Sequence, residues 1–291
     1  MIISDKTFSN FDNVVYDFVS TEYGKMWKTY LNNFHSVRAG ITESILSESF
    51  SVDASTKNAF TPYDWIAEAV ISNYKNKDKV IQRVSNLNIA DLGCGSFPMR
   101  NLTKLGNIIG IDISKQELDI AAKKGINSLI LGDVSVVPLR SSSVDVVIST
   151  MALMLFDPLE RVLFEINRIL KPGGIGFILL PSSGPLSAGD LSKYSRLLLA
   201  AKLKRLDYPN DVAIQRISPI LSSYNFEILS DEKLRFSFLV KNADLARTFI
   251  DSLYLPTVES ENYEKLIKLS SKWIGKSLGI PLRRIYFIKK Y

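Results

Sequence analysis

Cysteine and histidine are nearly absent from this sequence, which holds one of each, Cys94 and His35, in 291 residues. A single cysteine excludes a disulfide within the chain, and one cysteine with one histidine cannot form a Cys/His zinc site. Nothing in the sequence indicates another metal, so we predict none. No apolar run approaches the roughly 20 residues of a membrane span, and residues 1–10 lack a signal-peptide core. We therefore expect no membrane span and a cytoplasmic location.

Positive charge is unevenly distributed along the chain. The formal net charge is +6, and residues 190–291 contain 18 Lys and Arg against 11 Asp and Glu. A basic region of this kind is typical either of a solvated, lysine-rich surface or of a surface that binds nucleic acid. The charges are interleaved with apolar residues and form no tight cluster, which favours the solvated surface but leaves the other interpretation open.

Short apolar runs alternate with helical stretches through the middle of the chain. Strands are expected at 88–92, 108–111, 128–131, 144–149 and 175–180, and helices near 98–105, 115–124 and 159–170. This alternation predicts an α/β fold, with a doubly wound, mostly parallel sheet and crossover helices. A further helix is expected from Pro62 to Tyr74, with Thr61 as its N-cap.

The flanking segments are predicted to be helical additions to this core. Aromatic residues at loosely helical spacing over 8–50 indicate an N-terminal helical cap, which we assign to 1–60. After Pro181, helices are expected near 191–203, 211–224, 243–254 and 260–276, and strands at 226–240 and 282–289. The main domain would then comprise 61–241 and 279–291, and a helical insertion before the last strand would comprise 242–278.

A ligand-binding turn is predicted where the first apolar strand ends, in the run Ile89 to Gly95. Gly93 and Gly95 allow positive φ and let the backbone approach a ligand closely. Ser96 is expected to cap the following helix, with Pro98 in its first turn. The N-terminus of that helix would then favour an anionic group in the turn.

A carboxylate at the end of the second strand, Asp112, can accept hydrogen bonds from both hydroxyls of a ribose. This placement fits the ligand crevice of open α/β sheets. The same layout could hold a dinucleotide, but that fingerprint needs a third glycine where Pro98 stands. Asp91 and Asp133 also fit the dinucleotide pattern less well.

Five motifs together resemble the class I S-adenosylmethionine-dependent methyltransferases, most of all the methyltransferase type 11 family with its ubiquinone/menaquinone-biosynthesis members. Motif I, Asp/Glu-x-Gly-x-Gly-x-Gly, is similar to Asp91–Phe97, with Phe97 in place of the third glycine. The remaining matches are Asp112 for motif II, Gly132–Val134 for motif III, Val144–Thr150 for motif IV, and Glu165–Gly174 for the signature before the fifth strand.

The resemblance implies a seven-stranded Rossmann-like sheet, with S-adenosyl-L-methionine as cofactor and S-adenosyl-L-homocysteine as product. It implies that Asp112 binds the ribose and Asp133 the adenine amino group. The predicted cofactor-binding residues are Asp91, Gly93, Cys94, Gly95, Asp112, Ile113, Asp133, Val134, Ser149 and Tyr16. Tyr16 is included because Phe11–Asp17 is similar to a family element whose Tyr closes the cofactor pocket. It could equally be an aromatic residue of the cap core.

Methyl transfer is an in-line displacement that needs alignment and exclusion of water, and a base only when the acceptor must lose a proton. The stretch that faces the methyl group in the family is 149–158 here. It lacks the Asn/Asp-Pro-Pro-Tyr/Phe element of amino methyltransferases and offers an apolar wall instead: Met151, Leu153, Met154 and Phe156. No catalytic residue is assigned, and His35, Asp157 and Tyr16 are the candidates.

The leading hypothesis is therefore an enzyme that methylates a small or lipid-like acceptor at O, N or C. The cap and the insertion are expected to enclose that acceptor. The alternative is an RNA methyltransferase, acting on tRNA or rRNA through the basic C-terminal third. A protein that binds the cofactor without catalysis is a third possibility.

Overall fold

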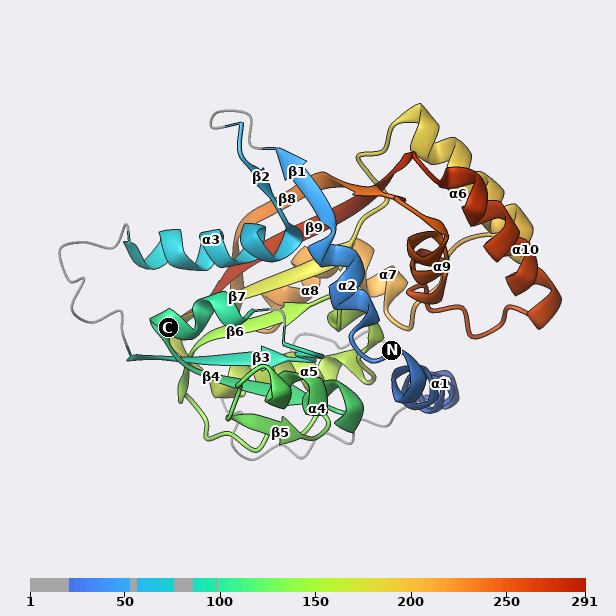
Figure 1. The fold of residues 1–291 in the computed structure, drawn as a ribbon. Helices are drawn as coiled ribbons and strands as arrows, with labels where there is room; N and C mark the ends of the chain where they lie inside the picture. Colours follow the sequence, from blue (N-terminus) through green and yellow to red (C-terminus); the bar gives the residue numbers. More distant parts are fainter. Residues whose placement is uncertain (1–20, 53–56, 76–85, 98) are drawn as a thin grey trace.

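A nine-stranded sheet forms the centre of the computed structural model, which describes residues 21–52, 57–75, 86–97 and 99–291 (Figure 1). The strand order is β2-β1-β8-β9-β7-β6-β3-β4-β5. The strands are β1 (Ser49–Val52), β2 (Ala59–Phe60), β3 (Leu87–Leu92), β4 (Gly106–Asp112), β5 (Leu129–Leu131), β6 (Val144–Thr150), β7 (Leu170–Pro181), β8 (Phe226–Leu239) and β9 (Ser277–Lys289). From β3 to β7 every pairing is parallel, and β9 runs antiparallel between β7 and β8.

The predicted count of seven strands is wrong, because part of the predicted helical cap forms two more. β1 pairs antiparallel with β8, and β2 pairs antiparallel with β1, at the far edge of the sheet. In β1 the side chains of Ser49 and Ser51 are less exposed than those of Phe50 and Val52. That alternation has the two-residue period of a strand. The other seven strands keep the doubly wound, mostly parallel arrangement that the sequence predicts.

Helices cover both faces of the sheet and enclose two of the three apolar cores in the described residues. One core contains side chains of α3 (Pro62–Lys75), the 3-10 helix η3 (Arg100–Leu105) and α4 (Lys115–Lys123). The other contains side chains of α5 (Leu159–Ile169), α7 (Asp211–Gln215) and α8 (Ile217–Ser223). The predicted cap of α3 is confirmed, because the Thr61 hydroxyl accepts the Asp64 N–H at 3.1 Å and the Asp64 carboxylate accepts the Thr61 N–H at 3.0 Å.

The cap and the insertion lie together beside the carboxyl ends of the parallel strands. The described cap helices are α1 (Glu22–Arg38) and α2 (Ile41–Ser47), and the insertion contains α9 (Ala243–Asp251), α10 (Ser260–Ser270) and η5 (Ser271–Trp273). Figure 1 shows α9 and α10 grouped with α6 (Ala188–Ala201) at one end of the molecule. Tyr30 of α1 accepts the Leu255 N–H at 2.9 Å, which ties the cap to the insertion.

A buried ion pair fixes α6 to the last two strands. Asp190 is 1% exposed and lies 2.7 Å from Arg235 of β8. Its carboxylate also accepts the Gly279 N–H of β9 at 2.8 Å. These contacts hold α6 beside the long β8–β9 ribbon, where it forms one wall of the larger cavity described below. Within the described residues, no helix combines the length and apolarity that a membrane span requires.

Candidate active site

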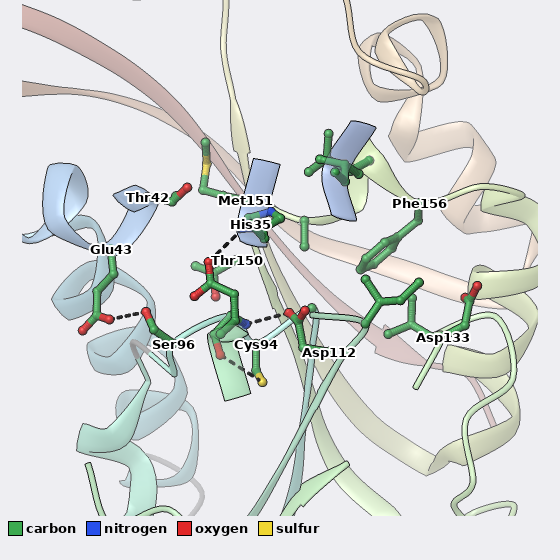
Figure 2. Close-up of a pocket in the computed structure, with 18 of the residues that line it drawn as sticks. His35, Thr42, Glu43, Cys94, Ser96, Asp112, Asp133, Thr150, Met151 and Phe156 are labelled. Carbon is green, nitrogen blue, oxygen red and sulfur yellow. Dashed lines mark hydrogen bonds and ion pairs between the residues drawn. The ribbon is translucent and has the colours of Figure 1, made fainter. Parts of the chain in front are cut away.

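A cleft opens at the carboxyl ends of β3, β4, β5 and β6, and the loops that follow these strands line it (Figure 2). From these loops come Gly93, Cys94, Gly95, Ser96, Asp112, Ile113, Gly132, Asp133, Val134, Thr150, Met151, Ala152, Leu155, Phe156 and Asp157. The rest of the lining comes from Lys28, Leu31, His35, Thr42, Glu43, Tyr63, Glu117 and Tyr254. Parallel strands bring their loops to one edge of the sheet, so motifs spread over about 70 residues meet there.

The turn after β3 is held close to the loop after β6. The N–H groups of Gly93 and Cys94 both donate to the Ile111 carbonyl, at 2.8 and 3.1 Å. Gly93 has a φ of +68°, and a Cβ at this position would lie 2.5 Å from the Ala152 Cβ and 3.1 Å from the Phe156 ring. Only glycine fits both the conformation and the space.

Phe97, which stands in place of the third glycine of the motif, adopts a backbone conformation that glycine favours. Its φ is +65°, in the left-handed region that the glycine would favour. That conformation costs about 1–2 kcal/mol for a residue with a Cβ. The ring is fully buried and packs over Gly110, where a Cβ would lie 3.2 Å from it. Burial of an aromatic ring contributes about 1.5–3 kcal/mol, which offsets the strain.

The predicted cap at Ser96 is wrong. The helix that follows the turn is the 3-10 helix η3, which begins at Arg100 and has no side-chain cap. The Ser96 hydroxyl instead donates to Glu43 of α2 (Figure 2). The turn is therefore fastened to the cap helices.

Asp112 is fixed by two backbone N–H groups at the centre of the cleft. Its Oδ2 accepts from Gly95 and its Oδ1 accepts from Ser114, both at 2.8 Å. Burial raises the pKa of Asp112, and these two hydrogen bonds act in the opposite direction. Each carboxylate oxygen can still accept another hydrogen bond, so the pair fits the two hydroxyls of a ribose.

Asp133 forms an ion pair with Lys28 of the cap helix α1, and this pair bridges the cleft. Its Oδ1 accepts the Ser135 N–H at 2.8 Å, and its Oδ2 lies 2.9 Å from the Lys28 ammonium. Burial acts to raise the pKa of Asp133, but hydrogen bonds from Ser135 and Lys28 outweigh it and hold the pKa below its usual value. The carboxylate is therefore ionised and can accept a further donor such as an amino group.

Cap residues close the cleft from the other side through Glu117, at the start of α4. Its carboxylate lies 2.9 Å from His35 Nδ1 and accepts the Gly40 N–H at 3.0 Å. Glu43 of α2 also forms an ion pair with Lys124. These contacts join segments about 80 residues apart in sequence, and no local motif indicated them.

Several buried polar atoms of residues that line the cleft or belong to β3 or β6 have no hydrogen-bond partner in the described part of the protein: both Asp91 carboxylate oxygens, Ser149 Oγ, Thr150 Oγ1 and Asp157 Oδ2. Burial raises the pKa of Asp91 to about 8, and the neighbouring Asp112 charge adds to the effect. Unsatisfied buried groups are costly and call for a partner. S-Adenosylmethionine carries a ribose diol, an adenine amino group and an ammonium, and this set of acceptors fits it.

Most of the predicted cofactor residues meet in the cleft. Those that line it are Gly93, Cys94, Gly95, Asp112, Ile113, Asp133 and Val134, and the candidates His35 and Asp157 line it too. Asp91 and Ser149 are fully buried and do not line it; Thr150 does. Tyr16 and Phe11–Asp17 lie outside the described residues. The roles of these residues stay predictions.

A second, larger cavity adjoins the cleft, and the two share Thr42, Met151 and Tyr254. Its volume is about 840 Å³. Its apolar lining comes from α2, the β6 and β7 ends, α6, the insertion and β9: Ile45, Leu46, Met151, Met154, Leu186, Leu198, Leu206, Ile214, Phe249, Leu253, Ile280 and Leu282. Met151 has a φ of +56°, a strained conformation of the kind found at functional sites.

Comparisons with known proteins agree with this geometry. Residues 90–178 match a family model described as a methyltransferase domain. The chain is 29% identical over 43% of its length to malonyl-[acyl-carrier protein] O-methyltransferase of Pectobacterium atrosepticum, covering 51% of that protein. It is 30% identical over 44% of its length to tRNA (carboxymethyluridine(34)-5-O)-methyltransferase of Macaca fascicularis, covering 20% of that protein. The matched segment thus spans about half of the first relative and a fifth of the second.

The fold is shared with solved structures over most of the chain. A putative sarcosine dimethylglycine methyltransferase from Galdieria sulphuraria has a TM-score of 0.51 at 15% identity, covering 91% of this chain and 98% of that one. At that identity the likeness shows the fold alone. Residues 90–178 of this chain therefore form a segment similar to the methyltransferase domain of S-adenosylmethionine-dependent enzymes, on a fold that the solved structures share.

Proposed function

We propose that the protein transfers a methyl group from S-adenosylmethionine to a small or lipid-like acceptor held in the larger cavity. The observation that carries this proposal is the junction between the two spaces, where Thr42, Met151 and Tyr254 line both. A cofactor in the polar cleft and an apolar acceptor in the cavity would meet at this junction. A cavity of about 840 Å³ falls within the usual range for ligand sites of roughly 300–1,000 Å³.

When bound, the cofactor supplies a methyl group already activated by a positively charged sulfur. Asp112 and Asp133 would hold the cofactor's ribose and adenine, and the cofactor's ammonium would be the partner that the buried Asp91 carboxyl lacks among the described residues. The cap closes the cleft through Lys28, His35 and Glu43, and the exclusion of water favours displacement at the methyl group. These residues bind and orient; none needs to form a covalent bond.

Asp157 is the stronger of the two described candidates for a base. It lines the cleft, and its Oδ2 has no partner among the described residues. His35 is already engaged, because its Nδ1 lies 2.9 Å from Glu117. The Asp157 carboxylate packs against α1 where Gly24 has no side chain, since a Cβ there would lie 1.9 Å from Asp157 Oδ2.

The proposed function is tested by incubating the protein with methyl-labelled S-adenosylmethionine and fractions of a cell extract. Label in an organic-solvent-soluble product is the expected result. An Asp112→Ala variant is the control, because it should lose the transfer. Label confined to RNA would replace the lipid-like acceptor with the alternative, and label in no fraction would contradict methyl transfer to a component of that extract.

An RNA acceptor is the second candidate, and the basic region 190–291 is the observation behind it. Seven of its 18 Lys and Arg residues form ion pairs with carboxylates. This pairing favours the solvated surface. RNA binding would show a steep fall in affinity with salt, because each neutralised phosphate releases counterions. Turnover that is insensitive to salt would count against it.

A further inference from the structure

The charged residues of the larger cavity fall into two groups, which come from different segments of the chain. Arg205 and Asp211 belong to the segment after α6, where Arg205 lies 2.8 Å from Asp207. Lys233 and Arg283 belong to the β8–β9 ribbon. The first group contains carboxylates and a cation together, whereas both residues that the ribbon contributes are cations.

The two ribbon cations lie side by side. Lys233 and Arg283 are direct partners in the antiparallel register of β8 and β9, so their side chains leave the same face of the sheet with Cβ atoms about 5 Å apart. Like charges placed directly opposite each other are destabilising unless an anion lies between them. The ribbon therefore needs negative charge at this point.

Asp231 is a carboxylate beside the two cations, and Arg283 donates to both of its oxygens. Arg283 donates to it through Nε at 2.7 Å and also through Nη2, and Ser218 donates to it at 3.3 Å. The third guanidinium nitrogen of Arg283 donates to the Ile214 carbonyl at 2.8 Å. The Lys233 side chain is exposed and forms no hydrogen bond or ion pair in the described part of the chain, although its charge helps to lower the pKa of Asp231. One positive charge on the cavity wall is thus left for a ligand.

The strand order gives the distance between Lys233 and Met151, where the proposed methyl transfer takes place. Met151 follows β6, and β7 and β9 lie between β6 and β8, where Lys233 stands. Neighbouring strands lie about 4.8 Å apart, so three spacings separate the two by about 14 Å. The wall between them is apolar and includes Pro181, Leu282 and Ile280.

We propose that the acceptor is an elongated apolar molecule with an acidic head group, a carboxylate or a phosphate, that binds Lys233 beside Arg283. This inference rests on the proposed function, since it places the other end of the molecule at Met151. The acidic head group fixes the position of the apolar part of the molecule along the cavity. The atom that is methylated then lies about 14 Å from the head group.

The test is calorimetric titration of the protein, loaded with S-adenosylhomocysteine, with dodecanoate, dodecyl phosphate and dodecan-1-ol below their aggregation concentrations. At least one anion should bind about tenfold more tightly than the alcohol, the magnitude of one charge-assisted hydrogen bond. The two anions distinguish a carboxylate from a phosphate head. Equal affinity for all three probes would overturn the proposal.

Lys233→Met keeps an apolar stem of similar length and removes only the charge. It should weaken anion binding about five- to tenfold and leave dodecan-1-ol unchanged. Lys268→Met is the matched control, because Lys268 is exposed on α10 and outside the cavity; it should change nothing. An unchanged anion affinity in Lys233→Met would also overturn the proposal.

Failure of this inference and failure of the proposed function give different results. Binding of S-adenosylhomocysteine and labelled transfer to a neutral product, without anion preference, would remove the acidic head group and leave the methyltransferase. Anion preference without S-adenosylhomocysteine binding would retain the ligand site and remove the transfer reaction.

Discussion

The cofactor cleft and the larger cavity adjoin each other but are built in different ways. The cleft is lined mainly by loops that directly follow consecutive strands, and backbone N–H groups fix its acidic side chains. The cavity draws its wall from α2, α6, the insertion and the β8–β9 ribbon, over more than 200 residues of sequence. The proposed donor site is therefore built mainly from residues that follow consecutive strands, whereas the proposed acceptor site depends on how distant segments pack.

This difference means that the two spaces depend on the sheet in different ways. Residues at the strand ends are placed by the parallel sheet itself. The cavity wall comes from additions to that sheet, which can change without disturbing the strands. Variants should accordingly affect one space and spare the other.

Gly93→Ala should produce the largest effect and confine it to the cleft. The added Cβ would lie 2.5 Å from Ala152, and φ is +68°. We expect affinity for S-adenosylhomocysteine to fall at least about 100-fold and the free energy of unfolding to fall by about 2–3 kcal/mol. Calorimetry and urea unfolding measure the two.

Gly125→Ala distinguishes the cost of a positive φ from the cost of a steric clash of the added Cβ. Gly125 also has positive φ, +86°, but a Cβ there would meet nothing within 4 Å. This variant should lose about 1 kcal/mol of stability and bind the cofactor product as the natural protein does. Equal behaviour of the two variants would show that the contact with Ala152 does not matter.

Leu253→Trp should block the larger cavity and leave the cleft intact. Leu253 lines only the larger space. Labelled transfer from S-adenosylmethionine should fall at least about tenfold, while affinity for S-adenosylhomocysteine stays within about twofold. Leu253→Ala, which enlarges the cavity, is the control and should retain binding. Loss of cofactor binding in both variants would mean that the two spaces are not independent.

Asp91→Asn should change how the stability of the cofactor-free protein depends on pH. The folded-state pKa of Asp91 is raised to about 8, above the unfolded value of about 3.9. The natural protein therefore loses stability as pH rises from about 4 to 8, because only the unfolded chain ionises freely. One pKa unit corresponds to about 1.4 kcal/mol, and urea unfolding at pH 5 and 9 should show the variant relatively more stable at pH 9 by at least that amount. If the stabilities of the natural protein and the variant changed equally with pH, the raised pKa of Asp91 would be contradicted.

The sequence predicted the parts of the molecule that repeat locally. Every predicted strand from 88 to 180 is present, and Gly93, Gly95, Asp112 and Asp133 meet in one cleft as their strand-end positions implied. The predicted helix at 98–105 is instead a short 3-10 helix, and the helix expected at 211–224 divides at Arg216. The first difference is one of helix type and the second is a break inside the predicted helix, and the spacing of apolar residues encodes neither.

The contacts across the cleft were not predictable, since they depend on tertiary packing. β1 forms because β8 offers it an edge, and β2 pairs with β1 in turn. Residues 49–60 do not reveal this by themselves. Glu117 carried no motif, yet it receives His35 and Gly40 from the cap. Tyr254 lines both spaces because the insertion folds back onto α1, where its ring lies 4.7 Å from that of Phe34.

The central claim is that this cleft binds the methyl donor through Asp112. Calorimetric titration of S-adenosylhomocysteine into the natural protein and Asp112→Ala tests it most directly. The natural protein should bind with a stoichiometry near one, and the variant should lose about 2–3 kcal/mol, or roughly 30- to 150-fold in affinity, with the loss of two hydrogen bonds to a charged group. No binding by the natural protein, or equal binding by a folded Asp112→Ala variant, would contradict the claim.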